Sequence, residues 1–210
     1  MQRDLVEVIK QFPLRNFSKG EAILQAGQPA DTLYAIRKGF AKVDSISRNG
    51  NQQLIWIASR YDIIPTESLF RTRGELHFYY SALTDLEAFE IPKKSFLDMC
   101  ENDIGVIREI AFSMSAHYDD LLIRLRSVEQ SSIRDKLIYT LHYIATRFSS
   151  ESVVHLDDLG LKFNHQDIGQ MIGATRETTA IELKRLKDEG LIDYTRSNFT
   201  INVDLIEPLL

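Results

Sequence analysis

The spacing of apolar residues divides the chain into segments of different structure. Over residues 1–16, apolar side chains recur at helical spacing, which predicts a short amphipathic helix. From Phe17 to about Pro92 they alternate with polar residues in short runs, and turn signals such as Asn49-Gly50 separate the runs. Many short strands at regular spacing predict a β-sandwich or a barrel in this region.

Helical spacing resumes after these strands. A short helix is predicted from about Lys93 to Cys100, and a long one from about Ile104 to Val128. In the long helix, apolar residues recur every three or four positions, as in the seam of a coiled coil. This favours a parallel pair of helices from two copies over packing within one chain. The seam residues are Ile107, Ala111, Met114, Tyr118, Leu121, Leu125 and Val128.

The last part of the chain has a different pattern. Ser131-Ser132 predicts the cap of a helix that continues to Phe148. Two short helical patterns then meet at a tight turn within residues 164–192. Gly173 breaks the first pattern, and Thr175 can cap the second. The alternating segments LIDYT and NFTINV predict a β-hairpin after it. A hairpin in this place is a wing, so the sequence predicts a winged helix-turn-helix.

Composition restricts the class of protein further. Apolar residues make up 44% of the 210 residues, and no apolar run approaches the roughly 18 residues of a membrane-spanning helix, so we expect no membrane partner. The single cysteine, Cys100, predicts a reducing cytoplasm and has no resolving partner for a redox sensor. Catalytic and metal-binding signatures are missing. Glu151, His155, Asp157 and Asp158 cluster, but their spacing fits no common metal site.

Three stretches together resemble the CRP/FNR family of bacterial transcription regulators. AILQAGQPADTLYAIRKGFAKV (residues 22–43) is similar to the entry into the family's cyclic-nucleotide-binding β-roll. YDIIPTESLF (residues 61–70) occupies the place of its phosphate-binding cassette. HQDIGQMIGATRETTAIELKRLKDEGLI (residues 165–192) is similar to its helix-turn-helix. The resemblance spans nearly the whole chain, and the last stretch is the most specific.

The resemblance implies an α+β fold with three parts. We expect a β-roll sensor domain of the cyclic-nucleotide-binding type over residues 1–103. A dimerisation helix and hinge over 104–130 and a winged helix-turn-helix domain over 131–210 would follow. The implied function is that of a homodimer that binds double-stranded promoter DNA in the cytoplasm and contacts RNA polymerase. The resemblance implies no enzymatic activity.

The resemblance assigns base reading to the start of the second helix. The family's Arg-Glu pair falls on Arg176 and Glu177. Arginine can bind guanine O6 and N7, and glutamate can accept a hydrogen bond from cytosine N4. Ala180 lies on the same outward face by position. Ile181 stands where relatives often have a basic residue, and it either contacts a thymine methyl group or is buried. Phosphate contacts are expected from Thr175, Thr178 and Gln166, and Arg196 at the wing tip is expected to reach the DNA backbone or the minor groove.

Charge leaves a second function open. From Ser131 to Leu210 there are nine Lys and Arg against twelve Asp and Glu, a net charge of −3. This is unusual for a DNA-binding domain. Glu182 also stands at a position that is usually apolar in the family. The alternative is a protein-interaction module whose winged helix contacts protein, and salt-dependent binding to promoter DNA would separate the two.

The sequence argues against cyclic AMP as the effector. The family holds the ribose with a Gly-Glu pair and the phosphate with an Arg-Ser pair, and here these positions hold Pro65-Thr66 and Leu76-His77. The remaining alternatives are a small hydrophobic or planar effector, a haem held by His77, or an effector-independent regulator with a filled core. The candidate effector pocket comprises Trp56, Thr66, Glu67, Leu76, His77, Tyr79, Leu121 and Leu122.

Overall fold

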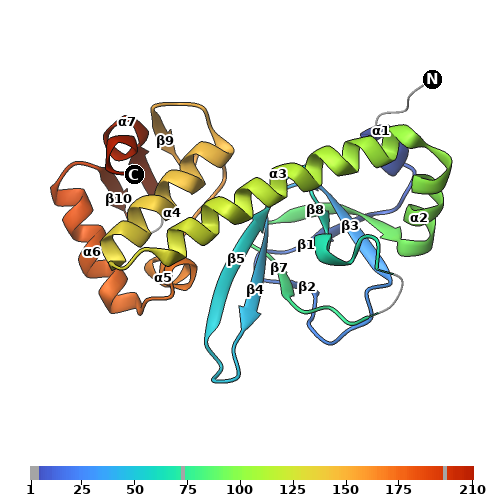
Figure 1. Cartoon of the computed structure of the whole chain (residues 1–210), viewed down its shortest axis with the longest axis horizontal. Coiled ribbons are helices and arrows are strands. Elements are labelled where there is room, and N and C mark those ends of the chain that lie inside the picture. The colour runs from blue at the N-terminus through green and yellow to red at the C-terminus, as the bar shows by residue number, and fades with distance from the viewer. Residues whose placement is uncertain (1–4, 72–73, 196–197) are drawn as a thin grey trace. The chain divides into compact units, whose positions relative to one another are not determined.

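The computed structural model describes residues 5–71, 74–195 and 198–210 (Figure 1). The chain forms two compact units. One comprises the chain up to Asn49 together with Ile55–Asp119, and the other comprises Gly50–Leu54 and Asp120–Leu210. Among the described residues, no helix is long and apolar enough to cross a lipid bilayer. The three-part division at residues 103 and 130 stays a prediction.

Two four-stranded sheets are formed by strands of the first unit, except that the Gln52–Leu54 part of β5 belongs to the second unit. One has the strand order β1-β8-β3-β6, and β8 runs antiparallel to β1 and β3. The other has the order β2-β7-β4-β5, and β7 runs antiparallel to β2 and β4. The strands are β1 (Leu14–Phe17), β2 (Ala22–Leu24), β3 (Thr32–Lys38), β4 (Ala41–Ile46), β5 (Gln52–Ala58), β6 (Ile63–Ile64), β7 (Tyr79–Ala82) and β8 (Leu86–Pro92). A short 3-10 helix, η1 (Thr66–Ser68), follows β6.

Strand β3 contributes to two separate cores, because successive side chains of a strand point to opposite faces. Tyr34 and Ile36 are buried in the cluster inside the roll. Leu33 and Ala35 are buried in a second cluster, which includes Phe96 from the helices that follow the roll. The strand is therefore apolar on both faces, which is why its sequence reads as an apolar run.

The N-terminal helix is shorter than predicted. Helix α1 comprises Leu5–Ile9, and residues 14–17 form β1 instead of the end of a helix. Strand β1 pairs with β8, where Phe17 lies opposite Leu86. In β1 only Phe17 is buried, so the local pattern of apolar residues does not reveal the strand. The sequence prediction for residues 10–16 is wrong because pairing with a distant strand decides their structure.

The two following helices have nearly the predicted bounds. They are α2 (Lys93–Asn102) and α3 (Ile104–Glu129). In the first unit, α3 buries Val106 and Ile110, which are 0% and 2% exposed. The predicted seam residues lie on another face, and Tyr118 and Leu125 are 63% and 51% exposed. The chain therefore leaves an apolar stripe of α3 uncovered.

The second unit is a winged helix-turn-helix, which confirms the predicted fold class (Figure 1). Its core includes Leu141 of α4, Ile168 of α5, Leu183 of α6 and Phe199 of β11, all 0% exposed. Three strands form a sheet in the order β10-β11-β9. The elements are α4 (Ile133–Phe148), β9 (Val153–His155), α5 (His165–Ile172), α6 (Arg176–Asp188), β10 (Ile192–Thr195), β11 (Asn198–Asn202), α7 (Val203–Ile206) and η2 (Glu207–Leu209).

Candidate nucleic-acid interface

A capping box fixes the start of α5, the first helix of the helix-turn-helix. The Asn164 side chain accepts hydrogen bonds from the backbone N–H groups of Gln166 and Asp167, at 2.8 and 3.0 Å. The Asp167 carboxylate in turn accepts from the backbone N–H of Asn164 at 2.8 Å. This reciprocal arrangement satisfies donors that a helix start otherwise leaves open. Gln166 is exposed beside this cap, as a phosphate contact requires.

The turn between the helices depends on glycine. Gly173 ends α5 in the left-handed region, with φ 68°. Gly169, one turn earlier, faces the backbone that leaves the turn. A Cβ atom on Gly169 would lie 2.8 Å from the carbonyl oxygen of Ala174, closer than real Cβ contacts allow. The close approach of the two helices therefore needs glycine at this position.

Thr175 caps α6 as predicted, and this cap sets which face of the helix is outward. Its side chain accepts a hydrogen bond from the backbone N–H of Thr178 at 3.2 Å. Thr179 is fully buried and donates to the carbonyl of Thr175 at 2.8 Å. Leu183 and Leu186 continue this inner face. The start of α6 therefore presents its other face to solvent.

The structure brings the predicted base-reading residues together on that outward face. Arg176 and Glu177 are exposed, and Ala180 is half-buried between them and the next turn. Ile181 is 57% exposed, so its burial in the core, one of the two alternatives for this residue, is wrong. Thr178 is also exposed, and its hydroxyl lies 3.1 Å from that of Thr175. Arg196 lies outside the described residues.

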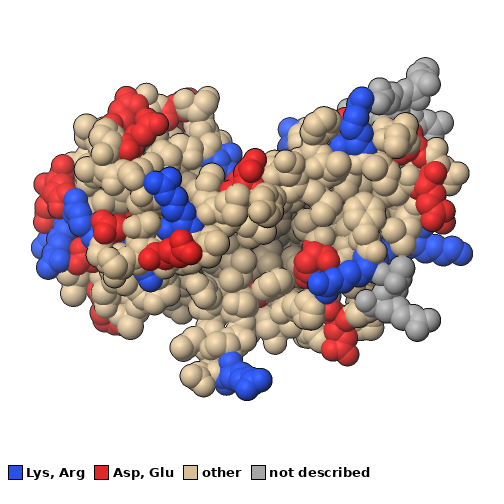
Figure 2. Space-filling view, viewed as in Figure 1, with Lys and Arg blue, Asp and Glu red and all other residues tan. Residues whose placement is uncertain are grey.

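Many cations of the second unit are held by carboxylates. Arg134 of α4 binds Glu189 through both terminal nitrogens, at 2.7 and 2.6 Å. Within α6, Arg185 pairs with Glu182 at 2.5 Å. Lys187 pairs with Asp193 of the wing at 2.5 Å. On the face drawn in Figure 2, Lys and Arg lie close to Asp and Glu at several places on a mostly uncharged surface.

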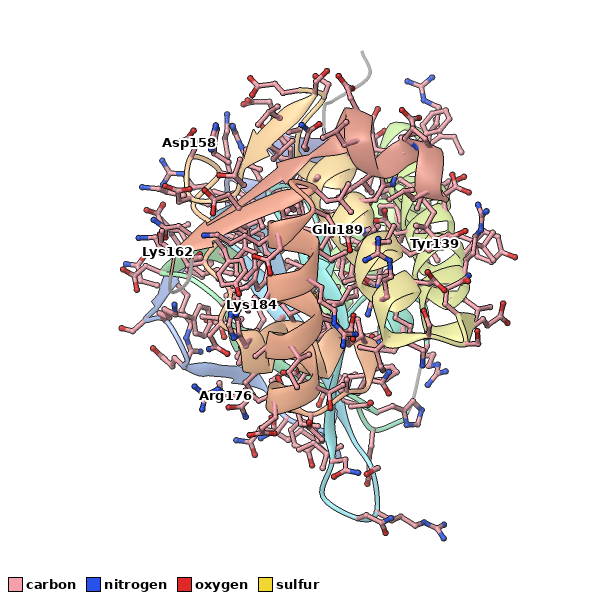
Figure 3. The ribbon with its side chains drawn as sticks, turned by 90° about the vertical axis from the view of Figure 1, so that its left-hand side faces the viewer. Tyr139, Asp158, Lys162, Arg176, Lys184 and Glu189 are labelled. Atoms are coloured by element: carbon pink, nitrogen blue, oxygen red, sulfur yellow. The ribbon has the colours of Figure 1, made fainter. Side chains whose placement is uncertain are left out.

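Three cations remain available on one side of α6. Among the described residues, no carboxylate lies within ion-pair distance of Arg176, Lys184 or Lys162. Figure 3 shows these three on the same side of the view, with Glu189 on the other side and Asp158 at the upper end. The local charge beside the recognition helix is therefore more positive than the net charge of the domain suggests.

Sequence reasoning missed Lys162. It lies in the loop between β9 and α5, where it is exposed between Leu161 and Phe163, both 0% exposed. A polar residue between two apolar ones at this point is the signal that could have found it. Because both neighbours are anchored in the core, the Lys162 side chain projects outward from a fixed backbone.

His165 links α5 to the wing instead of serving the interface as a cation. Its ring lies edge-on to those of Tyr194 and Phe199, with centroids 5.2 and 6.5 Å away. Burial lowers the pKa of His165, and the positive charge of Arg176 lowers that pKa further. The imidazole is therefore neutral at pH 7. Its aromatic contacts hold the wing strands close to the helix-turn-helix.

The residues of the candidate effector pocket differ in their burial. Trp56 and Leu76 are buried in the cluster that fills the roll. His77 is exposed, and its Nε2 atom lies 3.0 Å from Nη1 of Arg71. Tyr79 is 36% exposed. His77 is therefore not a buried axial ligand, and the roll does not fit a haem held by this residue. In the second unit, Leu121 and Leu122 are each 46% exposed.

Glu67 is the polar residue of this set that faces the interior. Its carboxylate accepts a hydrogen bond from the hydroxyl of Tyr80, which is 2% exposed. Burial and the neighbouring Glu67 raise the pKa of Tyr80, so the phenol keeps its proton. The other oxygen, Oε1 of Glu67, is buried without a hydrogen-bond partner among the described residues. Thr66 instead donates to the carbonyl of Ile63 at 2.9 Å.

Cys100 is a buried thiol in the second core cluster. Burial, together with the negative charge of Glu101, raises its pKa to about 11. Thiols react and oxidise through the thiolate, which is scarce at pH 7 with such a pKa. These properties agree with the expectation from sequence that Cys100 is not a redox sensor.

A β-roll, a long helix and a winged helix-turn-helix with an exposed Arg-Glu pair define a class of protein, the DNA-binding transcription regulators with an N-terminal sensor fold. Comparison with known proteins gives the same class. Residues 14–103 match the cyclic nucleotide-binding domain, and residues 135–204 match the Crp-like helix-turn-helix domain. The chain belongs to the CRP/FNR family of transcription regulators.

Curated relatives cover most of the chain at low identity. The cAMP-activated global transcriptional regulator CRP of Salmonella typhimurium is 24% identical over 179 residues, which are 85% of this chain and 84% of that protein. The cAMP-activated global transcriptional regulator Vfr of Pseudomonas aeruginosa is 22% identical over 181 residues, with the same coverage. These relatives are transcription regulators.

Solved structures show the same fold. FixK2 from Bradyrhizobium japonicum has a TM-score of 0.78 at 16% identity, and the match covers 94% of this chain and 96% of that one. The c-di-GMP responsive global regulator CLP of Xanthomonas campestris has a TM-score of 0.77 at 16% identity, covering 94% and 97%. At these identities the likeness concerns the fold alone.

Proposed function

We propose that this regulator is a cytoplasmic homodimer that reads a two-fold symmetric promoter site with Arg176 and Glu177 and acts through RNA polymerase. One observation carries the proposal. The two residues are exposed at the capped start of α6, where a recognition helix meets base edges in the major groove. Thr175, Thr178, Gln166 and Ile181 are exposed around them for phosphate and thymine-methyl contacts.

Lys162 and Lys184 extend this interface to the DNA backbone. Both are exposed on the side of α6 that carries Arg176 (Figure 3). A lysine without a carboxylate partner offers its whole charge to a phosphate, whereas Lys187 and Arg185 are already neutralised. This distribution supports DNA over a protein partner for the winged helix, although the domain carries a net charge of −3.

The homodimer is proposed from α3. Its exposed apolar residues include Phe112, Tyr118, Leu121 and Leu125, with exposures of 67%, 63%, 46% and 51%. An apolar stripe of this length on one helix is typical of a helix pair between two copies. In a two-fold dimer, each recognition helix would meet one half-site, about one helical turn of DNA from the other.

The effector we propose is a small molecule other than cyclic AMP. Support comes from the buried Oε1 atom of Glu67, which would accept a hydrogen bond from a hydroxyl or amine of such a molecule. The alternative, an effector-independent regulator, is favoured by Trp56, Leu76 and Tyr80, which fill the interior of the roll. Native mass spectrometry of the purified protein separates the two, since a bound small molecule supports the first and an unmodified mass the second.

Selection of bound DNA from random sequence tests the proposed function directly. We expect a palindromic motif, and we expect binding to weaken steeply as salt rises from 50 to 200 mM. Arg185→Ala is a matched control for variants of the interface, because Arg185 lies on α6 but is paired with Glu182. Absence of any enriched motif, or binding that does not depend on salt, would favour the protein-interaction alternative.

A further inference from the structure

The two halves of α3 bury different kinds of residues. In the first unit α3 buries the apolar Val106 and Ile110, and one polar residue, His117, whose Nε2 atom lies 2.8 Å from Oδ1 of Asp62. In the second unit it buries Asp120, Arg124 and Ser127, which are 8%, 6% and 0% exposed. These three are four and three positions apart, so they share one face of the helix. We call this face the polar seam of α3.

The polar seam holds the helices of the DNA-binding unit. The Asp120 carboxylate pairs with Arg147 of α4. The Ser127 hydroxyl lies 2.7 Å from that of Thr140, also on α4. Between them, Arg124 donates to the Thr140 hydroxyl at 3.1 Å. In Figure 1 the C-terminal part of α3 runs beside α4, with α5 at its end.

Arg124 also binds the first helix of the helix-turn-helix. Its Nη2 atom donates to the carbonyl oxygen of Met171 at 2.7 Å and to that of Leu54, in the same compact unit, at 3.3 Å. Met171 is the penultimate residue of α5, where carbonyl groups lack partners within the helix. The N–H groups of Gly173 and Ala174 both donate to the carbonyl oxygen of Gly169 and not to that of Met171. Arg124 therefore supplies the donor that Met171 needs, two residues before the turn into α6.

Every hydrogen-bond partner of Arg124 in the described residues is uncharged. Burial lowers the pKa of its guanidinium, and the neighbouring Tyr143 opposes this with a smaller effect. A buried cation is expensive, and an apolar side chain of similar length would fill this space at lower cost. Arginine differs in having a planar guanidinium group whose N–H donors point in fixed directions. Here these donors bind α4 and α5 at the same time. Its role is therefore one of geometry.

We propose that Arg124 is a positioning residue that fixes the helix-turn-helix on α3 and thereby sets the half-site spacing that the dimer accepts. This inference rests on the proposed homodimer. Leu121 and Leu125, on the exposed stripe of the same helix, would face the partner copy. The distance between the two recognition helices then depends on how rigidly each α6 is tied to its α3. Loss of the Arg124 contacts should broaden the range of half-site spacings that the dimer binds.

The experiment compares Arg124→Met and Arg124→Lys with wild type in the full-length protein. The half-site is first defined by selection from random DNA. Kd is then measured for pairs of half-sites whose spacing varies one base pair at a time, and for a single half-site. Arg126→Met is the matched control, because Arg126 lies two residues away on α3 and contacts Tyr139 of α4 and the Leu210 carbonyl but not α5.

We expect wild type to prefer one spacing over its neighbours by on the order of tenfold. In Arg124→Met this preference should fall to roughly threefold, with single half-site affinity within about twofold of wild type. The Tm should stay within about 5 °C, because truncation leaves no orphan charge behind. Arg124→Lys keeps the charge but loses the fork, so its preference should be intermediate. Arg126→Met should keep the wild-type preference.

An unchanged spacing preference in both Arg124 variants would overturn the proposal. A fall in Tm above about 10 °C in both would also overturn it, because Arg124 would then serve stability instead of geometry. Failure of the proposed function would give a different result in the same binding measurements. In that case wild type itself would gain nothing from a second half-site, and the homodimer and this inference would be rejected together.

Discussion

At the residue scale, the charged side chains of α6 divide into those with partners and those without. Arg185 and Lys187 are paired with Glu182 and Asp193, whereas Arg176 has no carboxylate within ion-pair distance in the described part of the chain. The paired cations of α6 can therefore serve as controls for the unpaired one. Substituting a paired and an unpaired cation removes equal charge, and only the unpaired one should matter for reading bases.

Arg176→Ala should weaken binding to the selected site by about 1–3 kcal/mol, or roughly five- to 150-fold. The reason is the loss of a bidentate contact with one guanine, so preference should relax at a single base position. Fluorescence anisotropy with the selected site and its single-base variants measures both effects. An unchanged base preference would refute the role of Arg176, and Arg185→Ala should behave like wild type.

Lys162→Ala and Lys184→Ala should have a different signature. Each is expected to weaken binding to all sequences about equally and to reduce the slope of log K against log salt by about one. The base preference should stay the same, because phosphate contacts carry no sequence information. Lys187→Ala, at a paired lysine, should leave the slope unchanged. A change in base preference in either lysine variant would contradict the assignment to phosphate.

His165 gives the DNA-binding unit a dependence on pH. Its pKa in the folded chain is lowered, by burial first and by Arg176 second. In the unfolded chain a histidine titrates near pH 6.5, so as pH falls the unfolded state binds the proton first. The free energy of unfolding should therefore fall as pH drops below about 6.5 toward the lower folded pKa. Burial lowers the pKa of His142 as well, which adds in the same direction.

Thermal melting between pH 7 and pH 5.5 tests this behaviour. We expect the Tm of wild type to fall over this range and that of His165→Gln to fall less. His155→Gln is a suitable control, because His155 is exposed on β9. Equal pH dependence of the wild type and His165→Gln would contradict the prediction.

At the element scale, the turn of the helix-turn-helix is the most constrained point. Gly169→Ala would place a Cβ atom 2.8 Å from the Ala174 carbonyl oxygen, which is backbone and cannot rotate away. We expect a loss of about 1–3 kcal/mol in the free energy of unfolding from this overpacking, and weaker DNA binding because α6 must shift. Urea denaturation and anisotropy measure the two effects. Wild-type values for both would show that the turn adapts.

The elements that the sequence predicted well are those specified by local patterns. The predicted helix from Ile104 to Val128 is observed as Ile104–Glu129, and Thr175 caps α6 as expected. Strand β1 was missed because its pairing with β8, about 70 residues away, decides its structure. Ion pairing was also beyond the sequence, since Arg134 and Glu189 are 55 positions apart. That pairing explains why an acidic domain can still present a local cationic face.

At the scale of the whole molecule, α3 is the element on which the proposals meet. Its buried residues are Val106, Ile110 and one histidine, His117, in the first unit, and all are polar in the second unit, where Arg124 contacts α5. Its exposed face is apolar, with Tyr118 and Leu125 among its members. One helix can therefore carry both subunit association and the orientation of the DNA reader.

Charge introduced into the exposed stripe of α3 should separate the subunits without unfolding them. Leu125 is 51% and Tyr118 is 63% exposed in the single chain, so Leu125→Glu with Tyr118→Glu removes little packing within the chain. In a dimer, four carboxylates would instead meet in an apolar seam, where like charges without partners oppose association. We expect a monomer by light scattering, with Tm lowered only by the lost association. Its affinity for a paired site should drop to that for one half-site. Glu129→Ala, at an exposed charged position of the same helix, should stay dimeric. A double variant that remains dimeric would show that another surface joins the subunits.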